Sequence, residues 1–130
     1  MPGQPVSKPT PNELEILRVL WERGPSTVRE VHEALSAARE IGYTTVLKIM
    51  QIMTAKGMVR RNEESRAHIY QACQPAEKTK QQLVSDLLHR AFAGSASQLM
   101  MHALAGKKTP EREIEEIRRM LDEYEEVKKS

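Results

Sequence analysis

The residues best suited to chemistry in this chain lie on one side of a short segment, residues 42–61. At about 100° per residue, Thr44, Lys48, Gln51 and Ala55 cluster within about 60° of a helix circumference. They offer hydroxyl, ammonium and amide groups without a carboxylate, a combination that suits the base edges of a DNA major groove. The pattern therefore predicts a surface that binds DNA.

The opposite side of the same segment is apolar and predicts a face that packs on a core. Val46, Ile49, Met50 and Met53 fall within an arc of about 100° at the helical repeat. Gly57 follows as a residue type that commonly ends helices. The segment is therefore interpreted as a recognition helix that ends just before a basic strand.

Two earlier helices are predicted from their start signals. Thr10 with Glu13, and Thr27 with Glu30, have the spacing of capping boxes. Three short helices, the third with a polar outer face, form a compact helix-turn-helix unit. The residues expected to face its core are Leu14, Ile16, Leu17, Leu20 and Trp21 in the first helix and Val28, Val31 and Leu35 in the second.

A β-hairpin is predicted directly after the recognition helix, with strands at residues 58–61 and 67–73 and a polar turn between them. Such a hairpin is a wing, and Arg60, Arg61, Arg66 and His68 are placed to reach the DNA backbone or the adjacent minor groove. Two acidic residues at the tip, Glu63 and Glu64, favour contacts at the groove edge over deep insertion. A simple solvated hairpin is the alternative.

The distribution of charge supports this location. Between Tyr43 and Gln74, five Lys and Arg residues stand against two Glu residues, so five minus two gives +3, whereas the ten basic and ten acidic residues from Pro75 onward cancel. The single cysteine, Cys73, is expected to be buried or half-buried at a strand end, in a reducing compartment. No apolar run approaches the roughly 20 residues that span a bilayer, so a cytoplasmic protein without membrane insertion is expected.

Beyond Pro75 the chain is predicted to form three amphipathic helices, at residues 77–92, 95–105 and 110–127, the last capped by Thr109. They lack a strong core of their own, which favours homodimerisation over packing on the chain's own DNA-binding unit. The expected fold is mainly α, with a winged helix-turn-helix domain at residues 1–74 and a helical dimerisation domain at residues 75–130. Its expected dimerisation residues are Leu83, Leu87, Leu99, Leu104, Ile114, Ile117, Leu121 and Tyr124.

Catalytic and metal-binding arrangements are not expected. The four histidines are scattered, and neither a paired Cys/His spacing nor a Gly-rich phosphate loop occurs. His89 and His102 lie on neighbouring predicted helices, but an ordinary surface role is favoured over a metal or pH-sensing site. We therefore expect no enzyme activity, no catalytic residues, no metal and no cofactor.

Three segments resemble the penicillinase repressor family, the BlaI, MecI and CopY group of bacterial repressors: residues 14–35, residues 43–61 with the wing sequence AHIYQA, and EIEEIRRMLDE near the end. The resemblance implies a homodimer that binds a palindromic double-stranded DNA operator, and it brings a membrane sensor-protease as a possible partner. It also implies that Tyr43 begins the recognition helix. Near a helix N-terminus Tyr43 can donate to a phosphate, or its ring can instead pack over the preceding turn. The expected DNA-binding residues are Tyr43, Thr44, Thr45, Lys48, Gln51, Arg60, Arg61, Arg66 and His68.

Two departures from the family leave the inducing signal open. The β-lactam-responsive members are cleaved at an Asn-Phe bond, and the corresponding positions here are His102 and Ala103. The copper-responsive members end in a cysteine-rich metal site, and no cysteine follows Cys73, so copper sensing through thiolates is not expected. The alternative function is a winged-helix module that binds another protein and no DNA.

Overall fold

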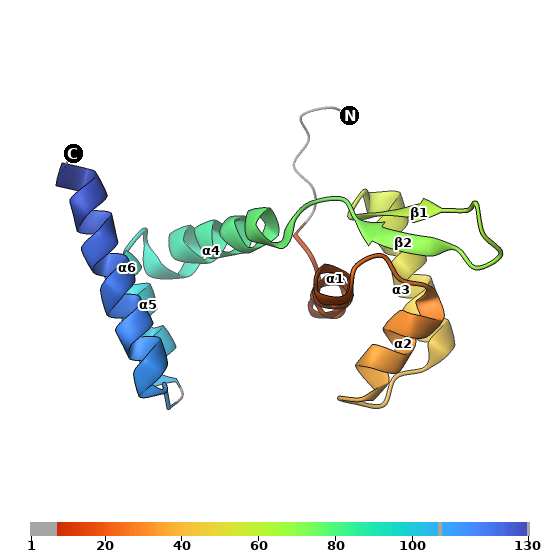
Figure 1. Ribbon diagram of the computed structural model, residues 1–130, viewed down its shortest axis with the longest axis horizontal. Coiled ribbons are helices and arrows are strands. Elements are labelled where there is room, and N and C mark those ends of the chain that lie inside the picture. The colour runs from red at the N-terminus through yellow and green to blue at the C-terminus, as the bar shows by residue number, and fades with distance from the viewer. Residues whose placement is uncertain (1–7, 107, 130) are drawn as a thin grey trace. The chain divides into compact units, whose positions relative to one another are not determined.

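The computed structural model describes residues 8–106 and 108–129. Figure 1 shows its helices and strands in chain order: α1 (Pro11–Arg23), α2 (Val28–Ser36), α3 (Tyr43–Lys56), β1 (Val59–Asn62), β2 (Ile69–Ala72), α4 (Ala76–Phe92), α5 (Ala96–Ala105) and α6 (Glu111–Lys129). The chain divides into two compact units, and the division falls inside α4, after Val84. The mainly helical, winged-helix fold expected from the sequence is confirmed.

The first two helices begin where their capping boxes predict. The Thr10 hydroxyl accepts from the Glu13 N–H at 3.2 Å, while the Glu13 carboxylate accepts from the Thr10 N–H at 2.9 Å. Thr27 and Glu30 repeat this pair of hydrogen bonds at the start of α2. Each box satisfies two backbone donors that the first turn would otherwise leave unpaired.

The first unit buries a single apolar core beneath α1, α2, α3 and the hairpin. The predicted inward faces are confirmed except that Leu14, Trp21 and Ile49 are half-buried. The Trp21 indole N–H donates to the Gln74 carbonyl at 3.0 Å and so fastens α1 to the segment before α4. The buried apolar residues are Ile16, Leu17, Leu20, Val28, Val31, Leu35, Val46, Met50, Met53, Met58, Val59 and Tyr70.

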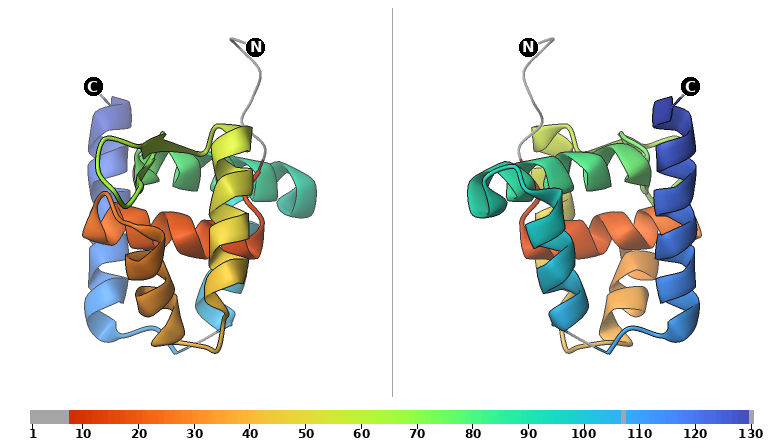
Figure 2. Two further views of the ribbon diagram at one scale, coloured as in Figure 1. Left: turned by 90° about the vertical axis from the view of Figure 1, so that its right-hand side faces the viewer. Right: turned by 90° about the vertical axis from the view of Figure 1, so that its left-hand side faces the viewer.

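The wing is tied to this core at its base. β1 and β2 pair antiparallel, with Val59 opposite Ala72 and Arg61 opposite Tyr70. On its other edge, Tyr70 exchanges two backbone hydrogen bonds with Ser26, at 2.8 and 3.0 Å. The connection between α1 and α2 therefore extends the hairpin by one bridge, and Figure 2 shows the hairpin beside α3.

β1 is shifted by one residue from its predicted position, and β2 is shorter than predicted. Gly57 adopts φ +81°, and the Met58 N–H donates back to the Met53 carbonyl at 3.0 Å, so Met58 takes part in the cap that ends α3 and β1 begins after it. At the tip, hydrogen bonds within residues 62–67 replace strand pairing. The expectation for Cys73 was wrong: its backbone N–H bonds to Met58, but the residue is exposed, because it lies past the end of β2.

The second unit contains the end of α4, together with α5 and α6. Ser95 caps α5 by accepting from the Gln98 N–H at 3.2 Å. α6 begins one residue later than predicted, since the Pro110 carbonyl accepts the first helical hydrogen bond, from Ile114, at 3.1 Å. The His102 ring lies 5.6 Å from the ring of Phe92. Among the described residues, no three His, Cys, Asp or Glu side chains gather into a metal site.

Candidate nucleic-acid interface

The third helix presents the two faces that its sequence predicts. Val46, Met50 and Met53 are fully buried, and Ile49 is half-buried beside them. The opposite side is exposed, as a helix that enters a major groove requires. We call this the base-reading surface; its members are Thr44, Thr45, Lys48 and Gln51.

The start of α3 is held by a residue that the sequence analysis did not select. The Nε2 atom of His32, on α2, lies 2.8 Å from the Ile41 carbonyl oxygen, which only a protonated ring nitrogen can bond. The His32 ring also meets the Tyr43 ring edge-on, with centroids 5.7 Å apart. Tyr43 nevertheless stays 46% exposed. The Tyr43 ring therefore packs on α2 through His32, while nearly half of the residue stays exposed.

The basic side chains between Pro9 and Gln74 fall into two groups. The first group has partners within the protein: Arg18 pairs with Glu22, Arg23 donates to the Glu30 carbonyl, His32 bonds to the Ile41 carbonyl, Arg39 pairs with Glu15, Lys56 pairs with Glu13, and Arg61 pairs with Glu63. The second group forms no side-chain hydrogen bond or ion pair with the described residues. We call it the free cationic group; its members are Arg29, Lys48, Arg60, Arg66 and His68.

The free cationic group lies on the elements that a winged helix uses for DNA. It comprises one residue at the start of α2, one on the base-reading surface and three on the wing. Positive charge without a protein partner is available to neutralise phosphates, and each such contact releases counterions from the DNA. Arg29 was missed from the sequence because no helical or motif spacing distinguishes it from the paired arginines nearby.

Arg60 and Arg61 differ, although the sequence treats them alike. Arg61 lies opposite Tyr70 and pairs with Glu63. A hydrogen bond to the Tyr70 side chain, together with the Glu63 charge, raises the pKa of the Arg61 guanidinium further above its usual value. Arg60 is exposed and belongs to the free cationic group. Of the two, Arg60 is better placed to meet a phosphate.

The residues predicted to form a dimer lie on the last three helices, and none of them is buried. Leu87, Leu104, Leu121 and Tyr124 are exposed. The other four predicted residues are half-buried: Leu83, Leu99, Ile114 and Ile117. Of these, Leu83 lies on the part of α4 that belongs to the first unit.

Comparison with known proteins identifies the family. The model of a family described as penicillinase repressor matches residues 9–123. The chain is a member of that family. Among its relatives, the Transcriptional regulator BlaI of Mycobacterium tuberculosis is 35% identical over 115 residues, which cover 87% of this chain and 82% of the relative. The Penicillinase repressor of Bacillus licheniformis is 22% identical over 117 residues, or 90% of this chain and 91% of the relative.

Membership of the penicillinase repressor family defines the class of function. The protein is a transcriptional repressor of the BlaI type and not an enzyme, and repression implies binding to DNA. The match extends across both units, so the winged helix and the last helices belong to one family architecture. Within residues 8–106 and 108–129, none of the helices combines the length and the apolar content needed to cross a bilayer.

Proposed function

We propose that this repressor acts as a homodimer on a palindromic operator, with one α3 in the major groove of each half-site. The observation that supports DNA binding most strongly is the free cationic group, which surrounds an exposed helix face without carboxylates. On that face, Thr44, Thr45 and Gln51 offer hydroxyl and amide groups to base edges, and Lys48 offers an ammonium group to guanine or phosphate. Tyr43 donates to a phosphate near the start of α3.

The wing contributes contacts to the backbone. Arg60, Arg66 and His68 lie on or beside the hairpin and form no ion pair with the part of the chain that the structure describes. Arg61 contributes less, because the Glu63 carboxylate already neutralises part of its charge. The acidic side chains near the tip favour contacts at the edge of a groove.

Dimerisation is supported by the apolar surface of the second unit. No described residue of α5 or α6 is buried, although both helices are amphipathic. Symmetric pairing of these helices would cover them and would place two α3 helices about 34 Å apart, one turn of DNA. We assign the dimer contacts to Leu87, Leu99, Leu104, Ile114, Ile117, Leu121 and Tyr124, with Leu83 at the margin.

Gel-shift titration tests the proposal. The full-length protein is titrated against its own promoter region and against unrelated DNA of equal length. We expect tight, sequence-specific binding that Lys48→Ala and Arg60→Ala each weaken by roughly tenfold, since hydrogen bonds to charged groups contribute about 1.5–3 kcal/mol. Arg18→Ala is the control. It removes a positive charge that is paired with Glu22 on the surface of α1, and it should leave affinity unchanged.

Two results would overturn the proposal. Equal affinity for both DNAs would remove sequence-specific repression. A protein partner captured with no DNA binding at low salt would favour the interaction module instead.

Induction of this repressor does not proceed through the Asn-Phe cleavage of the β-lactam-responsive members. His102 and Ala103 occupy the corresponding positions, and His102 packs against Phe92 at the junction of α4 and α5. A membrane sensor-protease, if it is a partner, must therefore act at another bond. DNA binding places the repressor in the cytoplasm.

A further inference from the structure

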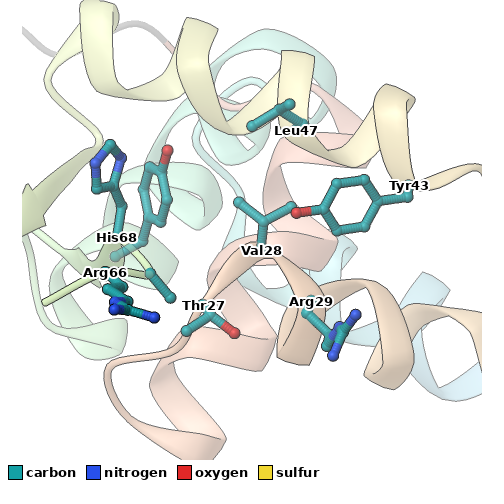
Figure 3. Close-up of a pocket in the computed structure, with 9 residues that line it drawn as sticks. Thr27, Val28, Arg29, Tyr43, Leu47, Arg66 and His68 are labelled. Carbon is teal, nitrogen blue, oxygen red and sulfur yellow. The ribbon is translucent and has the colours of Figure 1, made fainter.

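A groove beside the base-reading surface is not explained by base contacts. It has a volume of about 430 Å³, and its walls come from the start of α2, the first turns of α3 and the wing. In Figure 3, Arg66 and His68 lie on one side of this groove and Tyr43 and Leu47 on the other, with the Tyr43 hydroxyl directed over Val28. All of these elements belong to the first unit. Its lining residues are Thr27, Val28, Arg29, Tyr43, Leu47, Arg66, Ala67, His68 and Tyr70.

The charge of the groove has one sign. Its basic side chains are Arg29, Arg66 and His68, all from the free cationic group, and the described residues that line it include no carboxylate. The neighbouring Glu30 carboxylate is bound to the Thr27 N–H in the capping box and so faces its own helix. A groove that gathers unpaired cations from two separate elements is suited to an anion.

The position of the groove indicates which anion. Tyr43 and Leu47 lie about 90° around α3 from the centre of the base-reading surface. With the base-reading surface against the floor of the major groove, a flank at this angle faces the groove wall, where the sugar-phosphate backbone runs. The base-reading surface and the groove can therefore engage the same half-site together.

From these observations we infer that the groove binds a backbone phosphate of the operator, held between Arg29 on α2 and Arg66 on the wing, with the Tyr43 hydroxyl as a further donor. This inference rests on the proposed DNA binding and adds Arg29 to the residues that contact DNA. The arginine guanidinium forms short, charge-assisted hydrogen bonds with phosphate oxygens. The contact fixes the angle at which α3 enters the major groove, because it links α2 and the wing through one point on the DNA backbone.

The salt dependence of DNA binding provides the first test. Affinities of the wild type, Arg29→Gln and Arg18→Gln are measured by fluorescence anisotropy over a range of salt concentrations, on the operator duplex and on an unrelated duplex. We expect Arg29→Gln to lower the slope of log affinity against log salt by about one unit on both duplexes, as the loss of one phosphate contact requires. Arg18→Gln removes an equal charge from an exposed ion pair on α1 and leaves the slope unchanged.

A second measurement locates the phosphate. Operator duplexes are prepared with one uncharged methylphosphonate linkage at each successive position of a half-site. One position is expected to weaken binding of the wild type by roughly tenfold and to weaken binding of Arg29→Gln by clearly less, since the variant has already lost part of the same contact. Trp21 fluorescence during urea unfolding verifies that each variant retains the folded first unit.

The outcomes separate this inference from the function on which it rests. Sequence-specific binding with an unchanged salt slope in Arg29→Gln would overturn the inference and leave the repressor proposal intact. Absence of DNA binding by the wild type would overturn both. Titration with inorganic phosphate supplies the remaining arm: saturable binding that Arg29→Gln abolishes, without any effect on DNA binding, would make the groove a site for a free anion and would overturn the backbone contact.

Discussion

The two units of this repressor differ in how far they bury their apolar side chains. The first unit encloses twelve apolar residues from three helices and a hairpin. In the second unit, α5 and α6 contain no buried residue in the part of the chain described, and Leu121 and Tyr124 are 59% and 65% exposed. Burial of apolar surface is the main favourable term in folding. The first unit therefore has the means to fold alone, whereas the second keeps apolar side chains exposed, which is the basis for the proposed dimer.

The units differ in their ion pairs as well. In the first, Glu13 is 3% exposed and bonds both to Lys56 at 2.9 Å and to the Thr10 N–H. This pair joins the start of α1 to the end of α3. In the second, Arg112 and Glu116 are 3.7 Å apart on the surface of α6, an exposed arrangement that contributes little. The ion pairs thus show the same contrast as the apolar side chains: the first unit has a buried pair that joins two of its helices, whereas this pair of the second unit lies exposed on one helix.

The largest effect is expected when a charged residue is placed on the exposed apolar side of α6. Leu121→Asp should weaken self-association at least about 100-fold, because a dimer would have to bury an unpaired carboxylate at a cost of roughly 3 kcal/mol or more. Arg119→Asp places the same residue on the opposite, polar side of α6 and should leave association unchanged. Sedimentation equilibrium gives the association constants. A Leu121→Asp variant that dimerises like the wild type would contradict the assignment of this face.

An intermediate effect is expected in the core of the first unit. Ile16→Ala should lower its free energy of unfolding by about 3 kcal/mol through loss of buried methylene groups and the cavity left behind. The loss should be the same at every protein concentration, whereas Leu121→Ala should act only through association and so depend on concentration. Urea unfolding followed by Trp21 fluorescence reports the first unit, and far-UV circular dichroism reports both. An Ile16→Ala loss that varied with concentration would show that the first unit also depends on the dimer.

The smallest effect concerns pH. Burial alone would raise the pKa of Glu13, but hydrogen bonds from Thr10 and the Lys56 charge outweigh it and hold this pKa below its ordinary value near 4.5. A lowered pKa in the folded state contributes stability above pH 4.5, and that contribution is lost as the pH falls toward and through the folded-state pKa. Lys56→Gln should therefore destabilise the first unit by about 1–3 kcal/mol at neutral pH, since it leaves a buried carboxylate without its cation.

The same variant should also flatten the loss of stability on acidification. The measurement is urea unfolding by Trp21 fluorescence at several pH values. Arg112→Gln, which breaks the exposed pair on α6, is the matched control and should change stability by less than about 0.5 kcal/mol. Equal pH profiles for wild type and Lys56→Gln would remove Glu13 and Lys56 as the source of the contrast.

Much of the fold could be predicted because its signals are local. Capping boxes act over three residues, and the faces of α3 follow from the helical repeat, so both were located from the sequence alone. The errors occurred just past the ends of elements: Met58 was assigned to a strand although its N–H bonds to Met53 in the cap of α3, and Cys73 was expected to be covered although it lies past the end of β2. The roles of individual DNA-binding and dimerisation residues remain predictions for the experiments above.

The sequence by itself determined where the helices of the first unit begin, which of their sides face inward, and that the chain resembles the penicillinase repressor family. Only the tertiary structure decided which cations are free. Arg39 meets Glu15 across 24 positions of the chain and Lys56 meets Glu13 across 43, while Arg29 and Arg66 are left on either side of one groove. The physical reason is range: helix signals act between neighbours in the chain, whereas the partner of a charge is set by the packing of distant elements.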